Sequence, residues 1–313
     1  MTFPRSSPAV RDQCAATRAG PGTSGRRGVR QESGTAGFRA GRTAPATAHG
    51  GVTIGSMTLE RVAVLSDIHG VLPALEAVLA EPDVRAADAV VLAGDLLAGP
   101  QPVETLGLLR DLGDRAVWIS GNADRELVEL ARGDAGRPGA GPLPMDAWAA
   151  RQLGTADIGF LAGLPPTARL EVAGLGPVLF CHATPRDDAE VVLVDSRPAR
   201  WAEVLADVDA DVRAVVCGHT HMPFVRLTHG LLVVNPGSVG MPYGRPGAHW
   251  ALLGPGDSMT LRRTVYDYAA ACARIAAESA FEGAAEWAEE YVHARNSAED
   301  ALAAFGPLDG RAR

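Results

Sequence analysis

Residues 62–131 alternate between two kinds of hydrophobic pattern. Short runs of consecutive apolar residues are typical of strands buried on both faces, and apolar residues spaced three and four apart are typical of amphipathic helices. Strands that alternate with helices in this way predict parallel strands joined by crossover helices. The pattern places strands at residues 62–65, 89–93 and 116–119, and helices at residues 72–79, 102–112 and 124–131.

The pattern changes beyond residue 132. A Gly- and Pro-rich loop covers residues 133–145, and two short helical segments follow up to Leu164. Residues 267–304 are rich in Ala and Glu at helical spacing, which predicts a C-terminal pair of helices. Between these parts the sequence predicts short strands separated by turn residues. They lie at residues 169–172, 178–180, 214–217, 224–227, 231–234, 250–253 and 259–264, and the first two form a hairpin. We therefore expect an α/β domain of two packed mixed sheets with helices outside.

Residues 1–56 show no hydrophobic period and are rich in Gly, Ala, Ser, Thr, Pro and Arg. Such a composition cannot offset the entropy cost of ordering. Met57 stands directly ahead of the first good strand, so we predict that residues 1–56 are a disordered leader or a start-site artefact, with the native start at Met57. The main domain then covers residues 57–266, and residues 267–313 form a helical extension that packs on the core or builds a homo-oligomer interface.

The charge is unevenly distributed. The whole chain carries −8, residues 1–56 carry eight Arg and two acidic residues, and the remainder therefore carries −14. An acidic body argues against nucleic-acid binding, which needs clustered cations. No run reaches the roughly 18 apolar residues of a membrane span, and the four cysteines show no paired spacing. We expect a cytoplasmic protein without membrane or stable nucleic-acid partners.

Side chains of the kinds that bind metals follow the predicted strands in short blocks. In open α/β sheets, ligands bind in the crevice beyond the carboxyl ends of strands, so blocks far apart in sequence can share one site. Leaving Asp124 aside, they supply two Asp, one Asn and four His, which is about right for two ions. The blocks are Asp67-Ile68-His69, Gly94-Asp95, Gly121-Asn122-Ala123-Asp124, Cys181-His182 and Gly218-His219-Thr220-His221.

This ligand chemistry favours hydrolysis at a pair of divalent metal ions. Imidazole and carboxylate without thiolate suit Mn, Fe, Ni, Zn or Co, and leave Mg possible. A carboxylate such as Asp95 can bridge two ions roughly 3.5–4 Å apart, and water held between them becomes hydroxide near neutral pH. That hydroxide can attack phosphorus, so the site needs no Ser or Cys nucleophile, and the sequence shows no nucleophile-elbow motif.

The ordered set of blocks resembles the metallophosphoesterase (calcineurin-like phosphoesterase) superfamily over about residues 60–265. The superfamily pattern is DxH, GD, GNH-[DE], an isolated His and GHxH, and residues 66–75, 218–223 and 235–240 resemble its YfcE-like branch of small phosphodiesterases. The resemblance implies a four-layer α/β/β/α sandwich. It also implies a first metal on Asp67, His69, Asp95 and His221, and a second on Asp95, Asn122, His182 and His219.

One position departs from the superfamily pattern. Ala123 stands where the usual block has a His that acts on the leaving group or the phosphate, so the role of general acid is vacant or filled elsewhere. Asp95, Asn122 and Asp124 are the candidate catalytic residues. Asp124 either orients a ligand or is the N-cap of a helix beginning at Arg125. We predict slow turnover of alkyl phosphoesters and faster turnover of aryl or nucleotide-type esters.

The sequence thus predicts a dimetal phosphoesterase, with Mn as the favoured metal, acting on a small soluble phosphoester as a phosphodiesterase or nucleotide-type phosphohydrolase. Two alternatives stay open. The protein could be a metal-binding scaffold with little catalysis, for which Ala123 is the argument. It could also be a protein Ser/Thr phosphatase, which requires a groove for a phosphopeptide.

Overall fold

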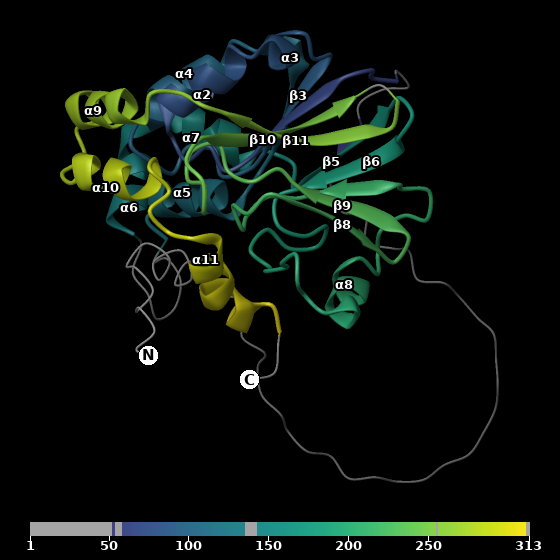
Figure 1. Ribbon diagram of the computed structural model, residues 1–313. Coiled ribbons are helices and arrows are strands. Elements are labelled where there is room, and N and C mark those ends of the chain that lie inside the picture. Colours follow the sequence, from purple (N-terminus) through teal and green to yellow (C-terminus); the bar gives the residue numbers. More distant parts are fainter. Residues whose placement is uncertain (1–51, 54–57, 135–142, 255, 311–313) are drawn as a thin grey trace, which may run out of the picture.

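The computed structural model describes residues 52–53, 58–134, 143–254 and 256–310. Two mixed sheets stack face to face, with most of the helices on one side of the pair (Figure 1). In the described part of the chain, no helix is both long enough and apolar enough to cross a bilayer.

The five-stranded sheet has the order β11-β10-β2-β3-β4. Its centre is parallel, and the register pairs Val62 with Ala89 and Val90 with Ala116. The strands are β2 (Val62–Leu65), β3 (Ala89–Ala93), β4 (Ala116–Ile119), β10 (Ala248–Gly254) and β11 (Ser258–Thr264). Every residue of β2 and β3 is buried, which explains why these strands read as unbroken apolar runs.

The six-stranded sheet has the order β1-β5-β6-β7-β9-β8. Strands β6, β7 and β9 are parallel, whereas β5 and β6 form the predicted antiparallel hairpin. The strands are β1 (Val52–Thr53), β5 (Thr167–Val172), β6 (Gly176–Cys181), β7 (Ala214–Val216), β8 (Phe224–Thr228) and β9 (Leu231–Asn235).

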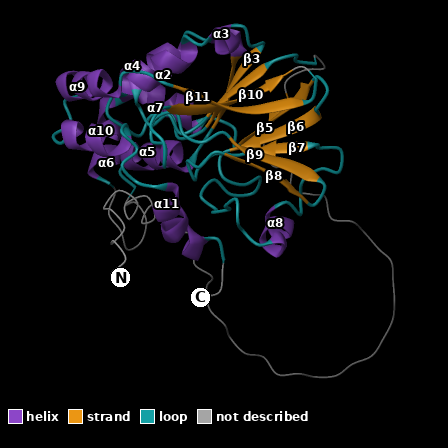
Figure 2. Ribbon diagram, in the orientation of Figure 1, coloured by secondary structure: helices purple, strands orange, loops and turns teal. Residues whose placement is uncertain are grey.

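Each face of both sheets is covered. Val64 and Val91 of one sheet meet Phe180 and Val216 of the other in the core between the sheets. The outer face of the six-stranded sheet packs on Trp201 of α8 (Pro198–Val204). The outer face of the five-stranded sheet packs on α2 (Leu72–Leu79), α4 (Pro102–Arg110), α5 (Asn122–Arg132), α6 (Pro144–Gln152) and α7 (Thr155–Ala162). The predicted four-layer α/β/β/α sandwich is confirmed (Figure 2).

The C-terminal extension contains three helices within the described residues, so the prediction of a helical pair is wrong. They are α9 (Tyr268–Glu278), α10 (Ala284–Tyr291) and α11 (Ala298–Phe305). Gly283 takes a left-handed conformation (φ 96°) before α10, and Ser297 caps α11 by accepting a hydrogen bond from Asp300 N (3.0 Å). The described residues also form the short helices α3 (Pro82–Arg85), η1 (Gly113–Arg115) and η2 (Gly306–Leu308).

The extension packs on the main domain. Ile275 of α9 and Ala288 of α10 are fully buried in the same apolar cluster as Leu75 of α2. An ion pair between Arg274 and Glu76 and a hydrogen bond from Gln101 Nε2 to Glu278 Oε2 (2.8 Å) tie α9 to the domain from outside.

Most of the predicted leader lies outside the described residues. Val52 and Thr53 are the exception, since they pair in parallel with Ala168 and Arg169 of β5. For these two residues the prediction of disorder is wrong, because they add a short strand to the edge of the sheet. The predicted loop at residues 133–145 is described only at its ends, where α5 runs to Arg132 and α6 begins at Pro144.

Candidate metal centre

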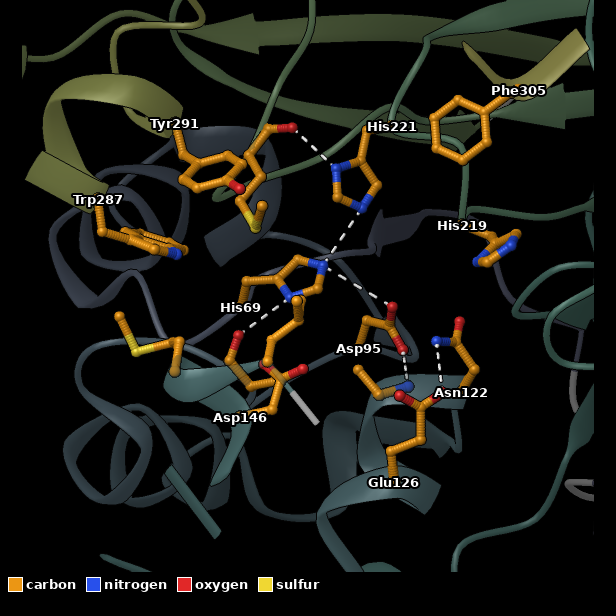
Figure 3. Close-up of a pocket in the computed structure, with 15 residues that line it drawn as sticks. His69, Asp95, Asn122, Glu126, Asp146, His219, His221, Trp287, Tyr291 and Phe305 are labelled. Atoms are coloured by element: carbon orange, nitrogen blue, oxygen red, sulfur yellow. Dashed lines mark hydrogen bonds and ion pairs between the residues drawn. The ribbon is translucent and has the colours of Figure 1, made fainter. Parts of the chain in front are cut away.

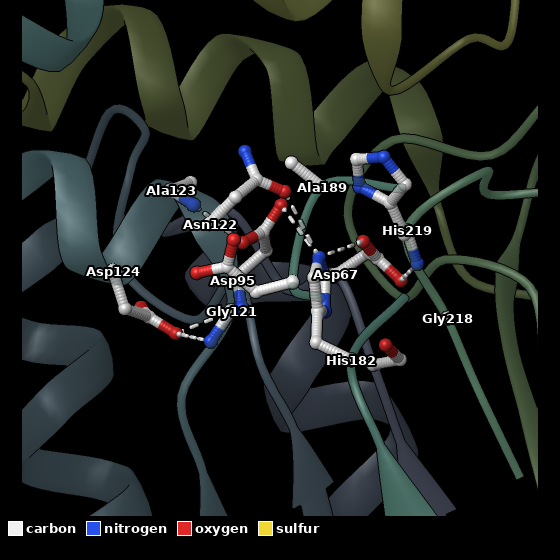
Figure 4. A network of polar contacts seen from close by, with 12 residues as sticks. Asp67, Asp95, Gly121, Asn122, Ala123, Asp124, His182, Ala189, Gly218 and His219 are labelled. Atoms are coloured by element: carbon white, nitrogen blue, oxygen red, sulfur yellow. Dashed lines mark hydrogen bonds and ion pairs between the residues drawn. The ribbon is translucent and has the colours of Figure 1, made fainter. Parts of the chain in front are cut away.

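The predicted ligands follow strands whose carboxyl ends meet at one edge of the two sheets. Asp67 and His69 follow β2, Asp95 follows β3 and Asn122 follows β4. From the second sheet, His182 follows β6, and His219 and His221 follow β7. Figure 4 shows side chains from both sheets converging, with Asp67, Asp95, Asn122 and His182 close together.

Backbone hydrogen bonds hold these loops against one another. Asp67 N donates to Gly94 O (3.0 Å) and His69 N to Asp95 O (3.0 Å). The glycines that open three of the blocks, Gly94, Gly121 and Gly218, permit the close approach. A Cβ on Gly121 would stand 2.2 Å from Asp95 Oδ1, and one on Gly218 would stand 2.5 Å from Asp67 Oδ2. The Gly in these motifs therefore leaves room for the carboxylates.

Five of the predicted ligands adopt left-handed backbone conformations. Their φ angles lie between 48° and 67°, a region that non-glycine residues seldom occupy. Such conformations persist only where the surrounding structure holds them, and they gather at functional sites. The five are Asp67, His69, Asp95, His219 and His221.

The side chains form two clusters that share Asp95, and within each cluster the ligand atoms lie within 4.8 Å of one another. The first cluster contains Asp67, His69, Asp95 and His221, and the second contains Asp95, His182 and His219. Asn122 joins the second, because its Oδ1 lies 3.2 Å from His182 Nε2. The structure thus brings together all seven predicted metal ligands in the two predicted groups.

In the first cluster, Asp67 Oδ1 lies 3.1 Å from His221 Nε2, and His69 Nε2 lies 3.7 Å from Asp95 Oδ2. In the second cluster, Asp95 Oδ2 lies 3.2 Å from His182 Nε2. These distances place Asp95 between the two groups, where one carboxylate can bind two ions.

The hydrogen bonds of the imidazoles point one nitrogen of each ring into the site. The Nδ1 atoms of His69, His182 and His221 face the backbone carbonyls of Ala98 (3.1 Å), Ala93 (2.8 Å) and Met241 (2.8 Å). An Nδ1–H that donates to a carbonyl leaves Nε2 as a bare lone pair, the form that binds metals.

Two observations indicate that a cation fits here. The Nε2 atoms of His69 and His221 face each other at 3.2 Å, although both are left as acceptors when Nδ1 carries the proton. Asp67 Oδ1 and His219 Nε2 are buried, and neither has a hydrogen-bond partner among the residues that the structure describes. Buried polar atoms are rarely left unpaired, and divalent cations in the two clusters would satisfy all of them.

The electrostatics of the site agree with this. Burial raises the pKa of Asp95, but His182 and His69 outweigh it and hold that pKa well below its usual range. Burial, helped by the charge of His182, lowers the pKa of His219 to about 4. Burial also lowers the pKa of His182, but Asp95 more than offsets it and raises that pKa to about 10, so a cation must displace a proton there.

Asp124 belongs to neither cluster. Its carboxylate accepts hydrogen bonds from the backbone N–H groups of Asp95 (2.8 Å), Leu96 (2.9 Å) and Gly121 (3.0 Å). Burial and the charge of Asp95 raise its pKa to about 7. Helix α5 begins at Asn122 with Gly121 as its N-cap, so the alternative that Asp124 is the N-cap is wrong. Asp124 positions the loop that carries Asp95 and does not line the cavity described next.

A cavity opens over the clusters, and its lining includes residues that the sequence analysis missed. Ala123 lines it, and Ala123 N donates to Asp95 Oδ1 (2.7 Å). The cavity is lined by His69, Asp95, Ala98, Asn122, Ala123, Glu126, Leu143, Met145, Asp146, His219, His221, Met241, Trp287, Tyr291 and Phe305 (Figure 3). Aromatic side chains from α10 and α11 thus reach the metal centre.

Glu126 fixes the orientation of a predicted ligand. Asn122 Nδ2 donates to Glu126 Oε1 (3.2 Å), which leaves Asn122 Oδ1 turned toward His182. One signal in the sequence could have revealed Glu126. It stands three residues after Ala123, and this spacing places both on one face of a helix.

Comparison with known proteins identifies the family. Residues 61–256 match the model of the calcineurin-like phosphoesterase superfamily domain. The chain belongs to this family. The family assignment predicted from the ligand blocks is confirmed, and α9–α11 lie beyond the matched residues.

Two of the proteins that this chain is similar to match it over most of their own length. An uncharacterised protein of Methanocaldococcus jannaschii is 29% identical over 207 residues, which cover 59% of this chain and 79% of that protein. The crystal structure of a metallophosphoesterase from Sphaerobacter thermophilus is similar with a TM-score of 0.54 and 26% identity, covering 69% of this chain and 93% of that one.

A third relative has a named activity. A symmetrical bis(5'-nucleosyl)-tetraphosphatase of Vibrio campbellii is 38% identical over 72 residues, which cover 22% of this chain and 27% of that protein. The match thus spans about a quarter of that enzyme.

Proposed function

We propose that the protein is a dimetal phosphoesterase that acts on a small phosphoester of the phosphodiester or nucleotide type. The observation that carries the proposal is the position of Asp95, whose carboxylate belongs to both ligand clusters. A single ion would leave three or more of the seven side chains without a role, whereas two ions use them all.

Asp67, His69, Asp95 and His221 would hold the first ion, and Asp95, Asn122, His182 and His219 the second. When bound, two divalent cations lower the pKa of a water between them and neutralise charge on phosphoryl oxygens. We propose Mn as the native metal, since imidazole with carboxylate suits it.

The protein's own groups set the geometry. The backbone carbonyls of Ala98, Ala93 and Met241 orient three imidazoles, and Glu126 orients the Asn122 amide. His219 N donates to Asp67 Oδ2 (3.1 Å), which fixes that carboxylate in turn. Rigid support of this kind keeps ligands within the narrow range that catalysis needs.

The tetraphosphatase named above supports a nucleotide-type substrate, because that relative acts on a phosphoric anhydride bearing nucleosides. Ala123 supports substrates with good leaving groups. A methyl group at this place in the cavity cannot donate a proton, so the departing oxygen must be stable as an anion.

The deciding experiment is hydrolysis of bis(p-nitrophenyl) phosphate by the full chain with Mn²⁺, compared with the Asp95→Asn variant. We expect turnover by the parent protein and at least a 10²-fold loss in the variant, together with loss of bound metal. The control is Asp209→Asn, which removes a carboxylate whose side chain is 75% exposed and belongs to neither ligand cluster.

No turnover with Mn, Fe, Ni, Zn, Co or Mg would contradict the proposal and favour a metal-binding scaffold. Turnover of a phosphopeptide in preference to every small phosphoester would favour a protein Ser/Thr phosphatase instead.

A further inference from the structure

Part of the wall of the cavity comes from outside the matched family domain. Trp287 and Tyr291 belong to α10 and Phe305 to α11, all beyond residue 256, yet they line the same cavity as His69 and His221. Figure 3 shows Trp287 and Tyr291 on one side of His69, and Phe305 near His221.

The two α10 side chains act together because they are four residues apart on one helix face. Their ring centroids lie 4.8 Å apart with the planes 40° from parallel. Met145 and Met241 extend this aromatic surface with thioether groups, which pack well against rings. Both rings are only partly buried, so they offer area that a ligand can still cover.

Phe305 is connected to the metal ligands through a series of packed rings. Phe305 is 1% exposed, and the centroid of its ring lies 6.3 Å from that of Tyr243. The Tyr243 centroid in turn lies 5.9 Å from the centroid of the His221 ring. The ring centroids of His221 and His69 lie 5.0 Å apart. Helix α11 is therefore packed directly behind the ligands rather than attached at the periphery.

The charges of the lining restrict the ligand further. Of the lining residues that the structure describes, none is Arg or Lys, and two are the carboxylates Glu126 and Asp146. A second anionic group in the cavity would lie near these two carboxylates, and like charges repel one another strongly in a partly buried site.

We propose that Trp287 and Tyr291, with Phe305 packed at the same cavity, form the binding surface for a planar, uncharged aromatic ring attached to the phosphate that the metals hold. A nucleobase or aryl ester has this chemistry. This proposal rests on the proposed function for the position of the phosphate. The aromatic side chains would determine which group attached to that phosphate binds best.

The test measures binding, so that leaving-group chemistry plays no part. Phosphonates carry carbon directly on phosphorus and are not hydrolysed, and their affinity for the Mn-loaded full chain can be measured by calorimetry. We expect phenylphosphonate to bind about tenfold more tightly than methylphosphonate, as ring stacking with burial provides. Cyclohexylphosphonate, which is apolar but not planar, should fall between them.

In the double variant Trp287→Ala/Tyr291→Ala, the affinity for phenylphosphonate should be only about twice that for methylphosphonate. The affinity for methylphosphonate itself should not change. Trp287→Phe keeps an aromatic ring, so it should retain most of the preference for phenylphosphonate over methylphosphonate. The matched control is Trp148→Ala, which removes an indole that packs on Phe281 and does not line the cavity. A carboxylate on the ring should weaken binding, so 4-carboxyphenylphosphonate should bind less tightly than phenylphosphonate. Asp146→Asn should narrow the difference in affinity between these two compounds.

An unchanged ratio in the double variant, or equal affinity for the phenyl and cyclohexyl compounds, would overturn the ring site. Hydrolysis of bis(p-nitrophenyl) phosphate is recorded in parallel. If the protein hydrolyses the ester but the double variant keeps the parent's ratio of phenylphosphonate to methylphosphonate affinity, only the ring site is refuted. If that ratio depends on Trp287 and Tyr291 but no hydrolysis occurs, only the proposed activity is refuted.

Discussion

Ala123 is the residue at which this site departs from the superfamily pattern. It is 7% exposed and lines the cavity, and its backbone N–H bonds the shared carboxylate of Asp95. A longer side chain at this position would therefore point toward the substrate without breaking that backbone bond.

We expect Ala123→His to accelerate hydrolysis of alkyl phosphoesters by about 10²–10⁴-fold and to change aryl esters far less. A poor leaving group needs a proton, and an imidazole at this position can donate one. The measurement is kcat across esters of graded leaving-group pKa.

Ala123→Leu is the control for this variant, because it fills similar space without a proton to donate. Equal effects of His and Leu, or no change on the poorest leaving group, would show that general acid catalysis is not what the parent site lacks.

Glu126 provides a second prediction at the level of single residues. Glu126→Ala removes the acceptor for Asn122 Nδ2, so the amide is free to turn its oxygen away from the second cluster. We expect affinity for the second ion to fall about 10–100-fold while the first ion binds as before.

Stepwise Mn titration followed by electron paramagnetic resonance would separate the two ions. Glu126→Gln is the matched control, since its carbonyl oxygen can still accept the hydrogen bond from Asn122. If Gln and Ala weaken binding equally, the charge of Glu126 matters and the hydrogen bond does not.

The seven side chains that the structure gathers in the two clusters could be picked out from the sequence, because each follows a strand and most lie near a recognisable neighbour such as Gly94 or Gly218. It did not predict Trp287, Tyr291 or Phe305. Their place at the metal centre depends on how α10 and α11 dock on the domain, and nothing local to those residues records that docking.

At the scale of elements, buried strands were the easiest to predict. The predicted bounds of β2, β3 and β4 agree with the structure. Full burial makes β2 and β3 continuous apolar runs, and β4 is apolar throughout although two of its four residues are only partly buried. Helix α8 was missed since only Trp201 and Val204 of its seven residues are buried, too few for a visible period. The C-terminal helices were merged because Ala-rich sequence continues across the break at Gly283.

Helix α9 offers a test of whether the extension belongs to the core. Ile275 is fully buried against the same cluster as Leu75. We expect Ile275→Ala to lower the free energy of unfolding by about 2–5 kcal/mol, measured by urea denaturation.

Val265→Ala is the comparison, because this side chain is 64% exposed and its loss should change stability by less than about 0.5 kcal/mol. A similarly small effect of Ile275→Ala would mean that the extension is only loosely attached to the domain.

At the scale of the whole molecule, the metal centre joins the two sheets. Ligands from β2, β3 and β4 in one sheet meet ligands from β6 and β7 in the other, so bound ions would link both halves of the sandwich. The same centre contacts the extension through Phe305 and Tyr243.

We therefore expect metal removal to lower the melting temperature substantially. An ion present at about 1,000 times its Kd stabilises the folded state by about 4 kcal/mol, which for a domain of this size is roughly 8–16 °C. Differential scanning calorimetry with and without a chelator measures the shift. Asp95→Asn should melt at nearly the same temperature with and without added Mn²⁺, and a large Mn²⁺ shift in that variant would contradict the shared role of Asp95.

The left-handed backbone at Asp67, His69, Asp95, His219 and His221 has a consequence for protein engineering. Each such residue costs roughly 1 kcal/mol or more, so five together approach the net stability of an ordinary domain. A short peptide that carries DxH or HxH would relax to ordinary backbone angles and aim its side chains elsewhere. Anyone who transplants this site into a new scaffold has to transfer the crossing loops and their glycines, and not only the seven ligands.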